Sequence, residues 1–337
     1  MDIVPLHELD ANLFRSALQV QQREETSVDP ATTPITEEEL RRFAVDDRTD
    51  GNRHERYAVV DGTRVRVIAH LEIEIGDENP HMATSEVFGA AEEPTAARLA
   101  LGHLLDIAVD DGRTLMLGWG PNTEKSHAFW TSVGAERKLR ERVSGLDVTA
   151  VDPALMATWI EQRQERAADV ELVRWVDVTP DEYMDSWVVS RMAMNDAPHE
   201  DLDLNDWEVD AGDIREDEDA RASLGTRLMN ILGLDPQGQP VGHTSVHVNP
   251  FRPAASRQWD TVVLDAHRRR GIGRWLKAEM WQWLRDVEPT VTRLTTENAQ
   301  SNDAMLAINI AMGFEPVAEY AAWQAPTDEC RAALENF

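Results

Sequence analysis

Residues 259–273 read Trp-Asp-Thr-Val-Val-Leu-Asp-Ala-His-Arg-Arg-Arg-Gly-Ile-Gly, and this stretch decides the organisation of the second half of the chain. The apolar, partly β-branched run at 259–264 is typical of a buried strand. Beyond the glycines, apolar residues recur at helical spacing and predict a helix that ends before Pro289: Ile272, Trp275, Leu276, Met280, Trp283, Leu284 and Val287. A strand, a glycine turn and a helix in this order are typical of a phosphate-binding loop.

The first turn of a helix offers unpaired N–H groups and a positive dipole end to an anion. Gly271 and Gly273 would let a phosphate approach the backbone, and the guanidinium groups of 268–270 match phosphate oxygens. The loop fits neither the Gly-x-Gly-x-x-Gly of dinucleotide-binding folds nor the Gly-Lys-Ser/Thr of P-loops. The alternative is a solvated basic patch on an ordinary turn; we favour a pyrophosphate site.

The loop resembles that of the GNAT acyltransferase superfamily, whose acyl-CoA pyrophosphate loop reads Gln/Arg-x-x-Gly-x-Gly/Ala. Arg268, Gly271 and Gly273 match this pattern. Val263 stands where the family has its strand valine, although Asp265 replaces a common proline. Further along, Asn298, Asn302 and Gly313-Phe314 resemble the second signature of the family, after its fifth strand.

The resemblance implies acyl transfer from acetyl-CoA, or another acyl-CoA, to an amine, without a covalent intermediate and without a metal. It places the coenzyme on Val263, Leu264, Arg268, Arg269, Arg270, Gly271, Ile272, Gly273, Arg274, Asn298 and Asn302. In the family the fourth and fifth strands splay apart, so we expect backbone groups near 263–264 to be free to face the pantetheine arm and the thioester. A backbone N–H aimed at the carbonyl would stabilise the oxyanion by about 3 kcal/mol.

An attacking amine must first lose its proton, so the reaction needs a general base. The candidates are Glu297, which we favour slightly, Asp260, His243 and His247. The alternative for each is a solvent-facing or cation-pairing strand residue. The proton donor for the leaving thiolate is less clear, because Asn309 stands where the family commonly has a tyrosine. Asn309 could bond the sulfur, Tyr320 could donate instead, or Tyr320 could be a packed aromatic.

The order of predicted elements repeats with a period of about 175 residues, which indicates a duplicated unit. The fold class is α/β (mixed α+β), with two tandem GNAT-like domains, each a mostly antiparallel twisted sheet flanked by helices. We expect domains at 1–150 and 169–337, joined by a connecting helix within 151–168. The first copy carries Glu92 and Glu93 where the second carries its arginines and glycines, and these carboxylates would repel a pyrophosphate. We expect it to be a structural partner, although binding through backbone N–H groups alone stays open.

Composition narrows the choice of partners. The net charge of −29 argues against nucleic acid, since two polyanions repel each other. A single cysteine, Cys330, excludes an intramolecular disulfide, and the start of the chain lacks the features of a signal peptide. We expect a cytoplasmic protein without a membrane span, as a monomer or homodimer.

The function that this sequence indicates is N-acyl transfer, most simply of acetyl, to the amine of a small polar metabolite. The acidic segment 196–213 would attract a cationic amine, although it could also be a solvated acidic face. A non-catalytic acyl-CoA sensor is the alternative, and Asn309 favours it. A protein-directed acetyltransferase is a third possibility, which a second domain walling the cleft would disfavour.

Overall fold

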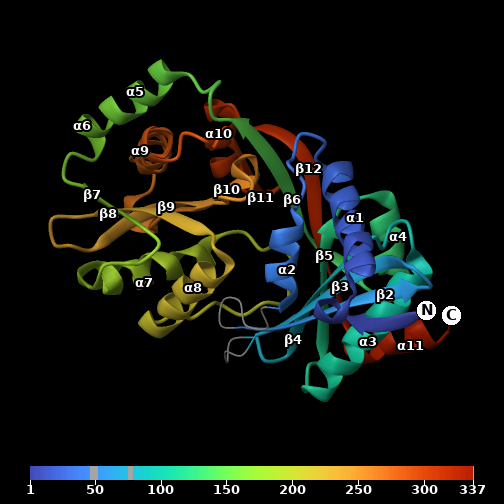
Figure 1. The fold of residues 1–337 in the computed structure, drawn as a ribbon. Coiled ribbons are helices and arrows are strands. Elements are labelled where there is room, and N and C mark those ends of the chain that lie inside the picture. Colours follow the sequence, from blue (N-terminus) through green and yellow to red (C-terminus); the bar gives the residue numbers. More distant parts are fainter. Residues whose placement is uncertain (46–51, 75–78, 337) are drawn as a thin grey trace. The chain divides into compact units, whose positions relative to one another are not determined.

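A computed structural model describes residues 1–45, 52–74 and 79–336, which fold into two compact units (Figure 1). Unit 1 comprises Met1–Arg142, His199–Asn205 and Val317–Phe337, and unit 2 comprises Val143–Pro198 and Asp206–Pro316. Ile75, expected near the end of the third strand, lies outside the described residues. None of the helices in the described ranges has the length and apolar character needed to cross a bilayer.

Unit 1 is built on a sheet with the strand order β1-β2-β3-β4-β5-β12. Its strands are β1 (Asp2–Pro5), β2 (Arg53–Asp61), β3 (Arg64–Ile73), β4 (Met82–Phe88), β5 (Leu115–Pro121) and most of β12 (Glu315–Pro326). Its helices are α1 (Ala11–Val28), α2 (Glu37–Val45), α3 (Pro94–Asp110), α4 (Glu124–Ser132) and α11 (Thr327–Glu335). Neighbouring strands are antiparallel except β4 and β5, which run parallel because helix α3 connects them.

The compact units differ from the domains expected at 1–150 and 169–337. Strand β12 was expected to complete the second copy, but from Val317 onward it belongs to unit 1 and pairs antiparallel with β5, Tyr320 opposite Pro121. Strand β6 (Glu136–Asp147) passes from unit 1 into unit 2 after Arg142, and in the sheet order it stands next to β11 (Arg293–Ala299). The last strand of the second sequence repeat therefore belongs mainly to unit 1, and β6 is divided between the two units.

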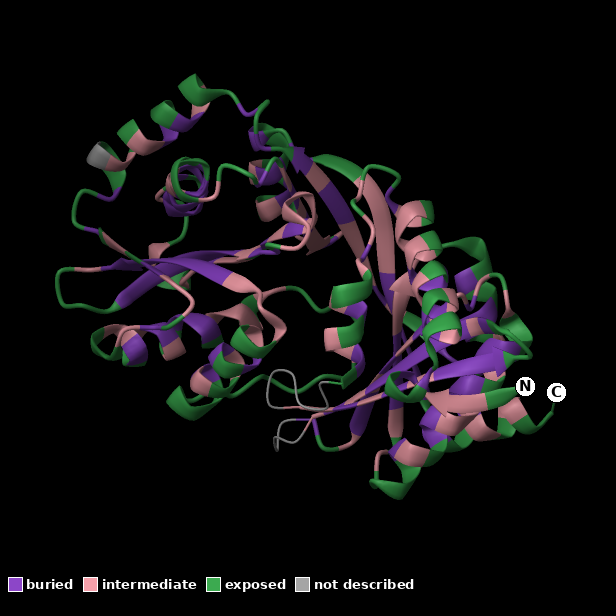
Figure 2. Cartoon of the chain, in the orientation of Figure 1, coloured by how far each residue is buried: buried purple, intermediate pink, exposed green. Residues whose placement is uncertain are grey.

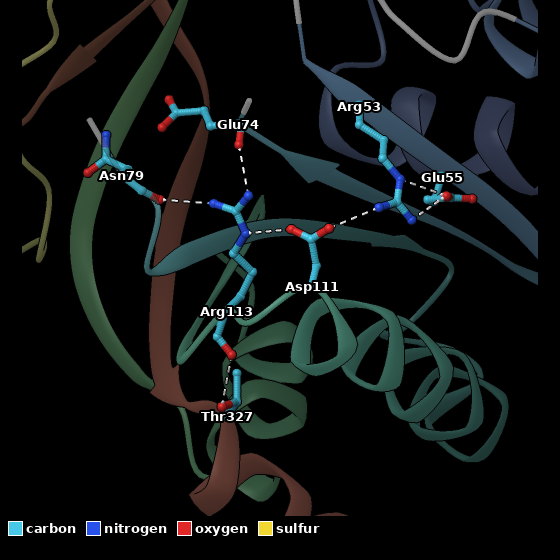
Figure 3. A network of polar contacts seen from close by, with 7 residues as sticks. All are labelled: Arg53, Glu55, Glu74, Asn79, Asp111, Arg113 and Thr327. Atoms are coloured by element: carbon cyan, nitrogen blue, oxygen red, sulfur yellow. Dashed lines mark hydrogen bonds and ion pairs between the residues drawn. The ribbon is translucent and has the colours of Figure 1, made fainter. Parts of the chain in front are cut away.

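An arginine-centred network ties loop ends of unit 1 together (Figure 3). Arg113 Nε donates to Asp111 at 2.9 Å, and its Nη2 donates to the Glu74 carbonyl at 3.0 Å. Asp111, just after α3, also accepts from Arg53 at 3.1 Å. Because Arg113 is largely buried, these bonds fix the end of β3 against the end of α3.

Unit 2 contains the loop that the sequence singles out. Its strand order is β6-β11-β10-β9-β8-β7, with β7 (Glu171–Val176), β8 (Arg227–Leu234), β9 (Pro240–Val248) and β10 (Ser256–Val263). Its helices are α5 (Pro153–Glu161), α6 (Arg163–Arg166), α7 (Met184–Met192), α8 (Ala211–Leu224), α9 (Ile272–Val287) and α10 (Asp303–Met312). Figure 1 shows α9 and α10 on one side of this sheet and α7 and α8 on the other. Helices α5 and α6 stand where a connecting helix was expected within 151–168, but both lie inside unit 2.

The core of unit 2 explains why α9 forms where it does. Trp275, Leu276 and Trp281 are almost fully buried against the sheet, and each contributes roughly 1.5–3 kcal/mol by leaving water. In Figure 2 the strands between the two helix layers are largely purple, and the outer faces of α7 and α8 are green. Helix α9 is therefore held by its apolar face, and its first turn need not be capped by a side chain.

Candidate active site

The turn between β10 and α9 has the geometry of an anion-binding loop. The chain leaves β10 at Val263, makes a short 3-10 turn at Asp265–His267 and enters α9 through Gly271, which has φ +80°. No side chain caps the helix, and its first backbone bond runs from Trp275 N–H to Gly271 C=O at 3.1 Å. Within the described part of the chain, the N–H groups of Ile272, Gly273 and Arg274 have no acceptor. They are available to an anion.

The two glycines of the motif serve different physical purposes. A Cβ on Gly271 would meet nothing within 4 Å, so its positive φ is the reason for glycine there. A Cβ on Gly273 would point into the protein, 3.5 Å from Ile308 and 3.7 Å from Val263. Gly273 therefore lets α9 lie close to α10 and β10, whereas the sequence suggested that it clears space for a ligand.

Two of the three consecutive arginines are already engaged within unit 2. Arg268 donates to the Val263 carbonyl at 3.0 Å and to Asp196 at 2.7 Å, with a longer contact to Asp265. Arg270 donates to the Arg166 carbonyl at 2.9 Å and forms an ion pair with Asp169. These guanidinium groups remain partly exposed, so a pyrophosphate could share them or displace their carboxylates.

The third of these arginines, Arg269, is exposed, and so is Arg274 in the first turn of α9. Arg269 has a left-handed backbone at φ +65°, which is rare for a residue with a side chain. The Arg274 guanidinium lies 5.8 Å from the centre of the Trp159 ring. The loop thus keeps a positive local field within a strongly acidic chain.

The strands that flank the loop separate where the family resemblance predicts. Parallel pairing of β10 with β11 is limited to Ser256 opposite Leu294 and Arg257 opposite Thr295. On its other edge, β10 has a bulge between Gln258 and Thr261 in its pairing with β9. Beyond these positions a gap opens between β10 and β11, as expected for a thioester arm.

Two backbone groups expected to be free at this gap are engaged. The Leu264 N–H donates to the Val241 carbonyl at 3.1 Å, and the Val263 carbonyl accepts from Arg268. The bulge in β10 leaves Trp259 and Asp260 opposite Ser245 alone on β9.

Glu297 and Asn298 project to opposite sides of the sheet, because they are neighbours in a strand. Asn298 accepts a hydrogen bond from Asn309 of α10 at 2.8 Å, which identifies its side as that of α9 and α10. Glu297 therefore faces the side of α7 and α8, where it forms an ion pair with Arg257 at 2.6 Å. The structure places this candidate base two residues past the last paired residue of β11, at the edge of the gap.

Asp260 lies in the bulge of β10 and forms an ion pair with Arg191 of α7 at 3.3 Å. Burial raises the pKa of Asp260, and the Arg191 guanidinium opposes this shift. Arg191 is itself buried among Trp187 and Trp207. The sequence analysis missed Arg191; its signal was an arginine on the inward-facing stripe of a helix with Met184, Trp187 and Ser190.

The two candidate histidines on β9 are held neutral by their surroundings. His243 is completely buried, its Nδ1 is 2.7 Å from Ser190 Oγ, and its Nε2 has no partner in the described structure. Burial and the Arg191 charge place the His243 pKa well below its usual value. Desolvation also lowers the pKa of His247 to about 4. Both rings are therefore uncharged near neutral pH.

The asparagines of the second signature have distinct surroundings. Asn302 caps α10 by accepting from the Met305 N–H at 3.3 Å. Asn309 is 1% exposed, donates to Asn298, and keeps a buried Oδ1 that has no donor within the described residues. Tyr320 lies in unit 1, with its ring 5.8 Å from that of Trp119, as expected for a packed aromatic.

The acidic segment 196–213 has specific structural contacts. Asp210 and Asp213 form a capping box at the start of α8, and Asp196 holds Arg268. Residues His199–Asn205 belong to unit 1, where the Asp203 N–H donates to Gln324 at 2.9 Å. The segment is therefore not one continuous acidic surface of unit 2.

Comparisons with known proteins bear on the family and on the fold. Residues 188–314 match the model of the acetyltransferase (GNAT) family. No curated protein matches the chain in sequence. Among solved structures, a tandem GNAT protein from the clavulanic acid biosynthesis pathway, determined without acetyl-CoA, has a TM-score of 0.74 and 24% identity, over 97% of this chain and 98% of that one.

Two further structures share the fold at lower identity. A GCN5-related N-acetyltransferase from Sphaerobacter thermophilus has a TM-score of 0.60 and 10% identity, over 93% of this chain and 92% of that one. A glucosamine N-acetyltransferase region of a fungal multi-domain β-N-acetylglucosaminidase has a TM-score of 0.62 and 11% identity, over 91% of this chain and 37% of that one. Residues 188–314 therefore form a domain of the GNAT acetyltransferase family, and the chain has the fold of a tandem GNAT protein.

Proposed function

We propose that this protein transfers an acetyl group from acetyl-CoA to the amine of a small polar metabolite, using the site in unit 2. The observation that carries the proposal is the conjunction of three unpaired N–H groups at the start of α9 with the gap between β10 and β11. An anion-binding helix start beside an opened pair of strands suits a coenzyme that joins a pyrophosphate to a narrow thioester arm. Acetyl-CoA would supply the acyl group in activated form.

Different residues of unit 2 would bind the coenzyme and accept the proton. The N–H groups of Ile272, Gly273 and Arg274 would hold the pyrophosphate, with Arg268 and Arg269 adding positive charge. Glu297, on the side of α7 and α8, would take the proton from the incoming amine, directly or through a water. Glu297 is favoured over Asp260, because Asp260 is tied to a buried arginine whose charge would be left unpaired if Asp260 were protonated.

A polar, cationic amine suits the carboxylates on this side of the sheet. Asp260 and Glu297 both stand at the edge of the gap, and Asp217 on α8 is close enough to Asp260 to raise its pKa. An ammonium group would be attracted to this cluster before it loses its proton.

Titration calorimetry with CoA and with acetyl-CoA tests the coenzyme, and thiol release with a panel of amino sugars, diamines and amino acids tests the reaction. We expect binding of both, and release of CoA with at least one amine. Binding without release for every amine would favour the sensor, which Asn309 in the tyrosine position also favours. No binding of either compound would overturn the proposal.

A further inference from the structure

Helix α3 of unit 1 carries a glycine in its interior, at Gly102. Glycine weakens the middle of a helix relative to alanine, and Gly102 does not have the positive φ that would call for it. Within the described chain, a Cβ at this position would meet only Leu334 of α11, at 4.0 Å, which is an ordinary contact. The missing side chain therefore leaves room on the outside of α3 that the described chain does not fill.

Gly102 lines a hollow of about 600 Å³ in unit 1, formed by α3, α11 and the start of β1 (Figure 1). Apolar side chains lie at this surface as well as charged ones. Leu99 lines the hollow and is 41% exposed, and Val109 near the end of α3 is 39% exposed. This face of α3 therefore leaves apolar surface in water that a partner could cover.

The charged side chains of the hollow balance one another. They are Arg98 and Asp106 on α3 and Arg331 and Glu335 on α11. Arg331 donates to Asp106 at 2.7 Å, and both side chains remain partly exposed. Two copies of a chain with a net charge of −29 repel each other, so a contact between them requires a patch without net charge. The hollow is such a patch.

The charges on α3 are also placed symmetrically about the glycine. Arg98 and Asp106 stand four residues before and after Gly102, so the three residues share one face of the helix. Along the helix axis, each charge lies about 6 Å from the glycine. If a second α3 crosses the first antiparallel at Gly102, Arg98 of each copy lies opposite Asp106 of the other. A two-fold axis through the crossing point makes both contacts at once.

We propose that this face of α3 is a dimer interface, in which two copies of the chain pack their α3 helices antiparallel across Gly102. The glycine lets the two helices approach closely, and Leu99 of each copy enters the hollow of the other. Asp106 keeps Arg331 and gains the Arg98 of the second copy, since a carboxylate can accept from both. Unit 1 thereby serves assembly. The inference is independent of the proposed function, because the coenzyme site lies in unit 2.

Sedimentation velocity over a concentration series tests the interface. One helix pair makes a small interface, so we expect the wild type to change from one chain to two with a Kd in the range of about 1–100 μM. Arg98→Asp would set two carboxylates against each other at both contacts, and Asp106→Arg would do the same with two guanidinium groups. Each should weaken dimerisation about tenfold or more.

The double variant Arg98→Asp/Asp106→Arg restores opposite charges at both contacts and should dimerise more tightly than either single variant. Loss of the Arg331 pair is common to Asp106→Arg and the double variant, so the difference between these two reports the contact across the interface. Arg41→Asp, which breaks an exposed pair with Glu37 on α2 of the same unit, is the control and should leave dimerisation unchanged.

Gly102→Leu tests the crossing point itself. The new side chain would fill the space between the helices, so we expect a monomer, with a melting temperature no lower than that of the wild type because leucine favours a helix. A wild type that stays monomeric at every concentration would overturn the inference. Dimerisation that survives Gly102→Leu, or a double variant no tighter than the single ones, would overturn it too.

Discussion

In unit 1 the first N–H group after strand β4, that of Gly89, donates to the partly buried carboxylate of Glu24 at 2.5 Å. In unit 2 the residue directly after β10, Leu264, donates its N–H to the Val241 carbonyl, and the N–H groups without an acceptor in the described chain lie further on, at the start of α9. The unit 1 loop is also covered, because a Cβ on Gly89 would stand 3.2 Å from Val20 of α1. The carboxylate of Glu24 thus plugs the start of the unit 1 loop, before α3 begins.

The strands beside the two loops also differ, because they stay paired for longer in unit 1 than in unit 2. In unit 1, β4 and β5 stay paired over five successive positions, from Met82 opposite Leu115 to Glu86 opposite Trp119. When β5 is aligned with β11 from their ends, Trp119 takes the place of Glu297. When α4 is aligned with α10 from their N-caps, Trp130 takes the place of Asn309. The Trp130 ring lies flat against Gly118, where a Cβ would come within 2.4 Å of it.

The two loops show which features the fold requires and which features coenzyme binding requires. Both copies keep the strand, turn and helix, so this framework is stable with or without an open anion site. An open anion site requires that no carboxylate blocks the loop and that the two strands beside it separate early. It also requires small or polar residues where unit 1 has tryptophan rings. These differences support a single coenzyme site, in unit 2.

The largest effect should come from closing the unit 2 loop with a negative charge. Gly271→Asp or Arg268→Glu would set a carboxylate against the pyrophosphate, and we expect CoA affinity to fall about a thousandfold, or roughly 4 kcal/mol. Calorimetry measures the loss, and circular dichroism checks the fold.

Gly112→Asp in unit 1 is the matched control for this change. Gly112 also has a positive φ, of +84°, and open space around its Cα. It should lose a similar amount of stability, about 1 kcal/mol, and no CoA affinity. Equal affinity of Gly271→Asp and wild type for CoA would refute the loop as the coenzyme site.

The next effect concerns the plug in unit 1. Burial, partly opposed by the Gly89 hydrogen bond, raises the pKa of Glu24 from 4.5 to about 7. Between pH 4.5 and 7 the folded state binds a proton that the unfolded state releases, so this group makes stability fall as pH rises through that window. Relative to Glu24→Gln, the wild type should lose about 3 kcal/mol of unfolding free energy between about pH 4 and pH 8.

Urea denaturation at the two pH values gives this difference, and the amide introduced by Glu24→Gln would still accept the Gly89 N–H. Glu8→Gln, at an exposed position, should show the same stability difference from wild type at both pH values. Parallel curves for wild type and Glu24→Gln would mean that the carboxylate is solvated and the loop is not plugged.

Glu297→Gln tests the residue that unit 1 replaces with Trp119. We expect kcat to fall about a hundredfold, because the amide cannot accept the amine's proton, while CoA affinity stays unchanged. Glu288→Gln is the control, since Glu288 is also ion-paired with an arginine of unit 2 but stands at the end of α9. Wild-type rates for Glu297→Gln across the pH range would remove it as the base.

Sequence patterns predicted the parts of the site that are local. The loop and α9 followed from apolar spacing and glycines within a single short stretch, and the separation of β10 from β11 followed from the family resemblance. The transfer of β12 to unit 1 could not be predicted, because alternation within a strand is the same whichever neighbour it pairs with. Ion pairs such as Arg191 with Asp260 are equally hidden, since they join residues from distant elements.

Lys277 is an intermediate case. It stood in plain view at helical spacing between Gly273 and Trp281, but a single lysine in an apolar stripe is usually read as a side chain that reaches solvent. It is 1% exposed, and this burial becomes evident only when α10 and Phe314 are packed against it.

The smallest effect, and the finest test of the comparison, concerns Asp196. This carboxylate holds Arg268 at 2.7 Å and so offers unit 2 a weak counterpart of the Glu24 plug. Both partners of the pair are about half exposed, and such pairs contribute roughly 0.2–1 kcal/mol. Asp196→Asn should therefore tighten CoA binding about twofold to fivefold at low salt, with the gain shrinking as salt rises. Asp181→Asn, which breaks an exposed pair with Arg215 elsewhere in unit 2, should leave the affinity unchanged. Weaker binding by Asp196→Asn would show that the carboxylate orients Arg268 for the coenzyme. The acidic groups of the two copies would then have different roles: Glu24 would block its loop, whereas Asp196 would assist binding.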